Sequence, residues 1–128
     1  MFLYNIFKFR LWGEGQILIS KCRILCLNLD SSASEILKNL ILAGVGFVGL
    51  VDSKNVSESD LKENFFVNID DLGKKRGQVC LNNLLELNSD CQGTFYDISP
   101  EDFLEINRLY LGTYDLIIVS NLNDVNFC

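Results

Sequence analysis

The residues that most directly suggest chemistry lie in a turn between an apolar segment and an amphipathic one. Residues 23–27 are almost continuously apolar, and the residues after the turn have the spacing of a helix. In a strand–turn–helix that binds phosphate, glycines at positions 28, 30 and 33 would let the backbone turn tightly and approach the anion. Here these positions hold Asn28, Asp30 and Ala33, with Ser31 between them. Asp30 would place a negative charge where the anion should lie, so the turn is predicted not to hold a phosphate.

Two further groups lie where a nucleotide-binding fold of this kind uses side chains. Asp52 directly follows a second apolar run, where an acid can bind a ribose, although an ordinary acid at the end of a strand is the interpretation we favour. Lys74, Lys75 and Arg76 lie near the start of a predicted helix, where positive charge opposes the helix dipole. The three cations indicate either an anionic partner or a solvated basic cluster, and the solvated cluster is the simpler interpretation.

The cysteine and histidine content excludes several other kinds of site. The chain has five cysteines and no histidine, so Ser–His and Cys–His catalysis cannot be built from it. The odd number of cysteines and the absence of a Cys-x-x-Cys motif argue against disulfides and zinc ligation. Cys26, in an apolar strand, and Cys80, on the apolar side of a helix, are predicted to be buried, reduced thiols. We expect neither a metal site nor a catalytic residue.

The elements that must position these residues alternate between strand and helix. Continuous apolar runs predict buried strands, and apolar residues at i, i+3, i+4 and i+7 predict amphipathic helices. The predicted strands are residues 23–27, 47–51, 93–96 and 116–119, and the predicted helices are residues 35–42, 72–88 and one that starts at Ser99 and Pro100. Shorter helices are predicted at residues 5–11 and 16–20.

Three local expectations concern the segments between these elements. The hydroxyls of Ser31 and Ser34 can cap the helix after the first strand. Residues 53–68 are expected to be polar and irregular, and the pair Phe65 and Phe66 is expected to belong to the core.

The order of strands and helices predicts an α/β fold with a Rossmann-like, doubly wound and mostly parallel sheet. Residues 1–128 would form one partial domain, with residues 1–22 as an N-terminal helical arm. No helix is predicted between the last strand and Cys128, so the sheet would be incomplete on its C-terminal side. We therefore expect a truncated gene product or a fragment with an exposed sheet edge.

Composition restricts the partners that the chain can have. Its 128 residues are 48% hydrophobic and 22% charged, as expected of one globular domain. The net charge is −6 and no long Lys/Arg block occurs, which argues against nucleic acid as a partner. No apolar stretch has membrane-spanning length and no signal-peptide pattern begins the chain. We expect a soluble protein of the cytoplasm, and also of the nucleus, that binds other proteins and no membrane.

Several motifs resemble the adenylation domains of ubiquitin-like activating enzymes, which are ThiF-like domains. They are residues 9–13, 35–46, 51–52, 64–66 and 73–74, and their order and spacing match over about residues 9–119. The turn without glycines, residues 86–90 and residues 99–101 are most similar to the regulatory, non-catalytic halves of heterodimeric members. The motifs are most similar to the regulatory halves of the neddylation branch, and the corresponding halves of the SUMO branch are the next most similar.

This resemblance implies that a nucleotide site in the chain would be vestigial. Active halves bind ribose through an acid that Asp52 matches, and they have a basic residue at the start of the next helix that Arg76 matches. They reach the phosphates with an arginine that is replaced here by Glu63. Their magnesium-binding aspartate is replaced here by Leu122. One cation, the metal ligand and the glycines of the loop are therefore missing.

The resemblance also implies partner contacts by the N-terminal arm. In the heterodimers this arm lends an arginine to the ATP of the other half. The first arginine of the motif is Phe7 here and the second is kept as Arg10. We expect Arg10, Trp12 and the three cations Lys74 to Arg76 to contact a partner, although the aromatic residues of the arm could equally pack on their own sheet.

These features predict the non-catalytic regulatory half of a heterodimeric ubiquitin-like protein activating enzyme. Its partners would be the catalytic subunit, which it scaffolds, and the ubiquitin-like protein. The chain itself would bind no cofactor, and the catalytic partner would hold ATP and magnesium. The alternatives are the SUMO counterpart, a stand-alone ATP-dependent adenylating enzyme with a degenerate loop, and a dinucleotide-dependent oxidoreductase, against which the absence of all fingerprint glycines argues.

Overall fold

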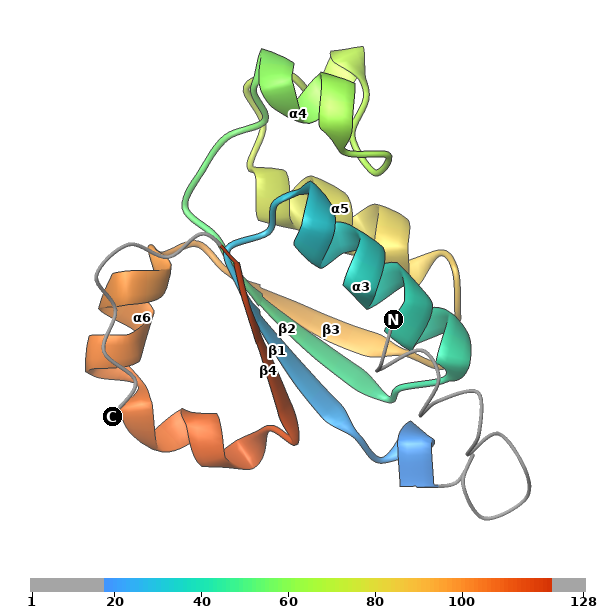
Figure 1. The fold of residues 1–128 in the computed structure, drawn as a ribbon, viewed down its shortest axis with the longest axis vertical. Coiled ribbons are helices and arrows are strands. Elements are labelled where there is room, and N and C mark those ends of the chain that lie inside the picture. Colours follow the sequence, from blue (N-terminus) through green and yellow to red (C-terminus); the bar gives the residue numbers. More distant parts are fainter. Residues whose placement is uncertain (1–17, 121–128) are drawn as a thin grey trace.

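The computed structural model of the chain describes residues 18–120 (Figure 1). A helical turn at residues 18–20 agrees with the end of the predicted helix 16–20. The predicted helix 5–11 and most of the arm 1–22, including Arg10 and Trp12, lie outside the described residues. The elements are, in chain order, β1 (Arg23–Leu27), α3 (Ser31–Ala43), β2 (Phe47–Val51), α4 (Glu58–Glu63), the 3-10 helix η1 (Ile69–Asp71), α5 (Arg76–Leu85), β3 (Gln92–Tyr96), α6 (Pro100–Ile106), the 3-10 helix η2 (Arg108–Thr113) and β4 (Leu116–Val119).

The four strands form one parallel sheet in the order β3-β2-β1-β4. The central strand β1 pairs Cys26 with Leu50 of β2 and with Ile118 of β4. All four predicted strands are confirmed. The inner strands β1 and β2 read as apolar runs because both of their faces are covered, whereas the edge strand β3 is less buried and less apolar. The predicted α/β fold with a Rossmann-like parallel sheet is likewise confirmed.

Helices cover both faces of the sheet (Figure 1). On one face, α3 and α5 pack on side chains that include Ile24 and Cys26 of β1. On the other face, α6 and η2 cover side chains that include Leu25 and Leu27. Successive residues of β1 therefore belong to two hydrophobic clusters, and the carboxyl end of β1 is held between two helical layers. Among residues 18–120, no helix combines the length and the apolar character needed to cross a membrane.

The segment that connects β2 to α5 differs from the prediction. Residues 53–68 were expected to be irregular, but they contain α4, whose first turn is closed by reciprocal hydrogen bonds between Ser57 and Asp60. The helix predicted at residues 72–88 is shorter, because α5 begins only at Arg76. Gly73 lies between η1 and α5. Its φ of 84° is a backbone conformation that residues with a side chain rarely adopt.

The side chains of the two adjacent phenylalanines in this segment point in opposite directions, one into the core and one into solvent. Phe66 is buried, as expected, but Phe65 is 83% exposed, so its assignment to the core was wrong. Asn64 explains the arrangement, because its side chain accepts a hydrogen bond from the backbone N–H of Phe66 and donates to Ser34 Oγ and Cys80 Sγ. These bonds fix the turn with Phe66 inward and leave the preceding ring in solvent.

Candidate functional site

The turn after β1 keeps a tight conformation without glycine. Asn28 has φ of 72°, in the left-handed region that glycine adopts most easily. Asparagine is among the side chains that tolerate this region best. The substitution therefore preserves the path of the backbone, while it adds a polar side chain where glycine would leave space.

That side chain joins three elements of the fold. Asn28 is buried, and its Nδ2 donates to the backbone oxygen of Ser120, directly after β4, at 2.7 Å. Its Oδ1 accepts a hydrogen bond from Arg76 Nη2, at the start of α5, at 3.0 Å. The amide thus fills the space at the carboxyl ends of the strands, where parallel α/β sheets bind their ligands.

Asp30 occupies the N-terminus of α3. Its Oδ1 accepts a hydrogen bond from the backbone N–H of Ala33 at 2.9 Å, and its Oδ2 accepts one from Ser120 Oγ. Asp30 is therefore the N-cap, and the expectation that Ser31 and Ser34 cap the helix was wrong. Ser31 is the first helical residue, and Ser34 Oγ donates to the backbone oxygen of Asp30. The carboxylate satisfies the helix end at which an anion would bind.

The guanidinium of Arg76 is the centre of a buried polar network. Its Nε donates to Asp52 Oδ2 at 2.7 Å, its Nη1 to Asp60 Oδ1 at 3.1 Å, and its Nη2 to Asn28. The Arg76 side chain is only 6% exposed. The interpretation of residues 74–76 as a solvated basic cluster was therefore wrong for Arg76, whereas Lys74 and Lys75 are exposed. A buried guanidinium also cannot serve as the surface contact that we expected of Arg76.

Asp52 is held by both of its carboxylate oxygens. Oδ2 bonds Arg76, and Oδ1 accepts a hydrogen bond from the backbone N–H of Lys54 at 2.9 Å. The residue is 1% exposed, so a ribose would have to displace one of these bonds to reach it. The residue is therefore one half of a buried ion pair, and not an acid that faces solvent at the end of a strand.

Asp60 is a member of this network that the sequence analysis missed. Its carboxylate also accepts hydrogen bonds from the backbone N–H and the hydroxyl of Ser57. Burial acts to raise the pKa of Asp60, but the bonds from Ser57 and the charge of Arg76 outweigh it, so this pKa lies below its usual value. The spacing Ser57-x-x-Asp60 is that of a capping box, and this signal could have revealed the short helix that carries the acid.

The two acids also act on the arginine. Burial acts to lower the pKa of Arg76, but the hydrogen bonds and charges of Asp52 and Asp60 outweigh this effect. The pKa of Arg76 is therefore raised above its usual value, and the guanidinium stays charged. No buried side-chain nitrogen or oxygen in residues 18–120 lacks a hydrogen-bond partner. Within the same residues, no group of His, Cys, Asp and Glu is arranged to hold a metal ion. The network is therefore satisfied by the chain itself.

The ThiF family model matches residues 5–121 of this chain. The chain belongs to the ThiF family. It is 40% identical over 119 residues to the Nedd8-activating enzyme E1 regulatory subunit of Drosophila melanogaster, and 34% identical over 118 residues to that of Gallus gallus. Each alignment covers 91% of this chain and 22% of the relative, so the chain spans about a fifth of the length of these proteins.

The chain is also similar to a yeast protein in sequence and to a bacterial protein in structure. The DNA damage tolerance protein rad31 of Schizosaccharomyces pombe is 32% identical over 122 residues, which are 94% of this chain and 39% of that protein. The structure of the E. coli tRNA N6-threonylcarbamoyladenosine dehydratase TcdA superposes with a TM-score of 0.77 at 19% identity, over 87% of this chain and 46% of that one. This last similarity shows the fold alone.

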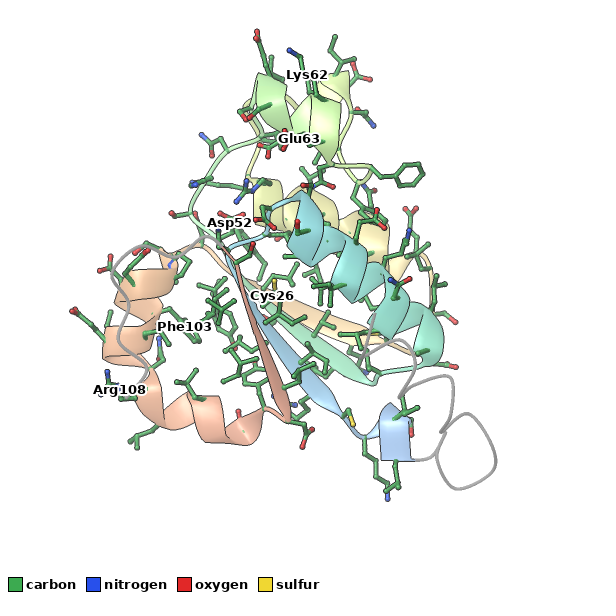
Figure 2. The ribbon with its side chains drawn as sticks, viewed as in Figure 1. Cys26, Asp52, Lys62, Glu63, Phe103 and Arg108 are labelled. Carbon is green, nitrogen blue, oxygen red and sulfur yellow. The ribbon has the colours of Figure 1, made fainter. Side chains whose placement is uncertain are left out.

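An acidic cavity adjoins the N-terminus of α3 in this ThiF domain. Its volume is about 340 Å³, and its lining includes Ser31, Ser32, Glu35 and, from α4, Glu63. Figure 2 places Glu63 on the side of α4 that faces the rest of the domain. Glu63 holds the position at which the resemblance implies an arginine in active halves, and residues 18–120 contribute no cation to the lining. The cavity therefore disfavours a phosphate.

The thiols of the ThiF domain lie in its core. Cys26 and Cys80 are buried and free, as predicted. Burial raises the pKa of Cys80 to about 12, and burial also raises the pKa of Cys26 far above its usual value. A thiol that stays protonated at neutral pH is a poor nucleophile and a poor metal ligand. Both residues therefore act as small apolar side chains between the sheet and its helices.

Proposed function

We propose that this ThiF domain is part of the regulatory, non-catalytic subunit of a heterodimeric activating enzyme of the neddylation pathway, and that its own nucleotide site is closed. The relatives that support this proposal are regulatory subunits of NEDD8-activating enzymes. The corresponding half of a SUMO-activating enzyme is the second candidate, and the relatives favour it less.

The observation that carries the proposal is the engagement of Arg76 by side chains of its own domain. Formation of an adenylate relies on cations that surround the phosphates of ATP. Here the buried cation at the carboxyl ends of β1 and β2, Arg76, bonds Asp52, Asp60 and Asn28. A triphosphate would have to break these buried bonds and would then meet two uncompensated carboxylates.

The helix end beside this network supports the same conclusion. Asp30 already accepts the hydrogen bond of the Ala33 N–H that a phosphate would otherwise accept. Its negative charge and that of Glu63 would repel a nucleotide that approached α3. We therefore infer that the chain binds no nucleotide or magnesium, and that ATP and magnesium are held by the catalytic partner.

In this proposal the domain acts by binding proteins. Its partners are the catalytic subunit, which it scaffolds, and the ubiquitin-like protein, in the cytoplasm and the nucleus. Arg10 and Trp12 of the arm, together with the exposed Lys74 and Lys75, are the proposed contacts. A polar centre that is satisfied internally suits this role, because it rigidifies the domain without a ligand.

A binding experiment tests the proposal. The tagged chain is incubated with the catalytic subunit of the NEDD8-activating enzyme and, separately, with that of the SUMO-activating enzyme, and the full-length regulatory subunit serves as a positive control. We expect retention of the NEDD8 partner, weaker retention by the variant Arg10→Ala/Trp12→Ala, and unchanged retention by the control variant Lys21→Ala. Absence of association where the full-length subunit binds would refute the proposal.

Two outcomes would point to the other functions considered. ATP–pyrophosphate exchange by the purified chain alone would indicate an adenylating enzyme with a degenerate loop. A rise in melting temperature with a nicotinamide dinucleotide would indicate an oxidoreductase, since a ligand that binds only the folded state stabilises it. We expect neither.

A further inference from the structure

We propose that a groove on the exposed side of α5 binds an extended, acidic segment of polypeptide. The groove has a volume of about 660 Å³ and lies between α5, the segment from η1 to α5, and β3. Its polar lining consists of five carboxamide side chains, Asn55, Asn68, Gln78, Asn82 and Asn83, two lysines, Lys74 and Lys75, and one acid, Asp71. The proposal does not depend on the closed nucleotide site, because it uses none of the Arg76 bonds.

The carboxamides offer the hydrogen bonds that a peptide backbone needs. A side-chain amide carries both donors and an acceptor, as each peptide unit does. Gln78 Nε2 donates to Asn82 Oδ1, and Asn83 Nδ2 donates to the backbone oxygen of Phe66. The remaining oxygens of Gln78 and Asn83 and the NH₂ group of Asn82 have no partner within residues 18–120. The groove therefore presents acceptors and a donor side by side.

The two lysines favour an acidic segment. The side chains of Lys74 and Lys75 are 61% and 48% exposed. Lys75 pairs with Asp97 at 3.3 Å, and both side chains of this pair are exposed, whereas Lys74 pairs at 3.6 Å with Asp71, whose side chain is only 14% exposed. An exposed pair contributes little stability, so a carboxylate of a ligand can replace Asp97 at small cost. In a chain of net charge −6, the lining of the groove carries two lysines against one acid, an excess of positive charge.

The floor of the groove is rigid and ends at an open sheet edge. The ring of Phe95 lies so close to the backbone of Gly77 that an added Cβ would approach the ring to 2.3 Å. This contact fixes β3 against the start of α5. No strand among residues 18–120 pairs with the outer edge of β3. An extended segment in the groove could therefore continue along this edge by adding main-chain hydrogen bonds.

The lining favours a polypeptide over a small anion. A phosphate accepts hydrogen bonds and donates few, so it would leave the free carboxamide oxygens of Gln78 and Asn83 without a donor. A peptide presents N–H groups to these oxygens and C=O groups to the NH₂ of Asn82, and acidic side chains reach the lysines at the rim. All these requirements are met by an extended backbone that carries carboxylates.

The test uses a fluorescein-labelled peptide of alternating valine and glutamate and measures its binding to the full chain by fluorescence anisotropy. We expect saturable binding, at least about fivefold weaker binding by Lys74→Ala/Lys75→Ala, and unchanged binding by Lys21→Ala/Lys62→Ala, which removes the same charge from exposed lysines outside the groove. The isosteric variant Asn82→Asp should also bind more weakly, because it adds a repelling charge without changing the shape.

Two changes to the probe separate main-chain recognition from charge alone. The same peptide with alternate backbone nitrogens methylated should lose most of its affinity, and a valine–lysine peptide should not bind. Millimolar inorganic phosphate should not compete beyond an equal ionic strength of chloride. The proposal is overturned if the valine–glutamate peptide does not bind, if the methylated peptide binds equally well, if phosphate displaces it, or if both double variants lose affinity alike.

Discussion

The Arg76 guanidinium determines the chemistry that this domain can support. A cation that is to hold a phosphate must have donors directed at it, and three of the five N–H groups of Arg76, one on each nitrogen, donate to side chains of the same domain. Asp52 and Asp60 neutralise its charge, and Asn28 adds a neutral acceptor.

Replacing Arg76 by methionine should destabilise the domain strongly. The substitution keeps an unbranched apolar stem but leaves Asp52 and Asp60 buried without a counter-ion. The loss of one partner of a buried ion pair typically costs about 3–5 kcal/mol. Urea unfolding followed by circular dichroism measures this difference.

The neighbouring lysine provides the control for this variant. Lys75→Met removes a charge from the exposed pair with Asp97, so it should change the free energy of unfolding by no more than about 1 kcal/mol. A loss for Arg76→Met as small as that of Lys75→Met would contradict the structural role of the network.

Asp60 should give the domain a specific sensitivity to acid. Its pKa is lowered in the folded state from an ordinary value of 3.8. The stability that the ionised carboxylate contributes is therefore fully present above pH 3.8 and is lost as the pH falls through the lower folded-state pKa. Asp60→Asn, which cannot titrate, should lose less stability over this acid range than the unmodified chain. Equal pH dependence of the two unfolding free energies would refute this assignment.

At the scale of elements, the site is made where α3, α4 and α5 meet the carboxyl ends of β1 and β2. Figure 2 shows Asp52 at this junction, with Glu63 and Lys62 on α4 beyond it and Cys26 within the sheet. The short helix α4 owes its position to the turn at Asn64, which is bonded to α3 and α5 and separates an inward from an outward phenylalanine.

The two phenylalanines of this turn offer a matched pair of variants. Phe66→Ala should lower the free energy of unfolding by about 3–5 kcal/mol, because it leaves a cavity in the hydrophobic core. Phe65→Ala removes an exposed ring and should change it by no more than about 0.5 kcal/mol. Thermal or urea unfolding of both variants tests the arrangement, and similar losses for the two would contradict it.

Elements with a strong local pattern could be predicted from the sequence, and the network could not. Strands β1, β2 and β4 and the helix after β1 follow from their apolar patterns, and the start of α6 at Ser99 and Pro100 follows from capping chemistry. The apolar pattern of α4 is too short to be informative. Arg76 bonds residues that lie 16, 24 and 48 positions away in the chain, and contacts of this kind depend on the assembled fold.

At the scale of the whole molecule, the chain combines the architecture of a ThiF domain with a polar centre that its own side chains satisfy. The structure superposes on that of a distant E. coli protein of the same fold, so this polar centre lies within an ordinary topology. Its side chains at the carboxyl edge include an amide at 28, a carboxylate at 30 and an acid at 60. These residues hold α3, α4 and α5 together, and in our proposal they close the position to a ligand.

Isothermal titration of the chain with magnesium-ATP tests this closure most directly, with the Arg76 Nε–H resonance followed by NMR under the same conditions. We expect no saturable heat up to millimolar nucleotide, and an Arg76 resonance that does not move. Micromolar binding accompanied by a shift of that resonance would mean that a triphosphate displaces Asp52 and Asp60, and it would contradict the closed site.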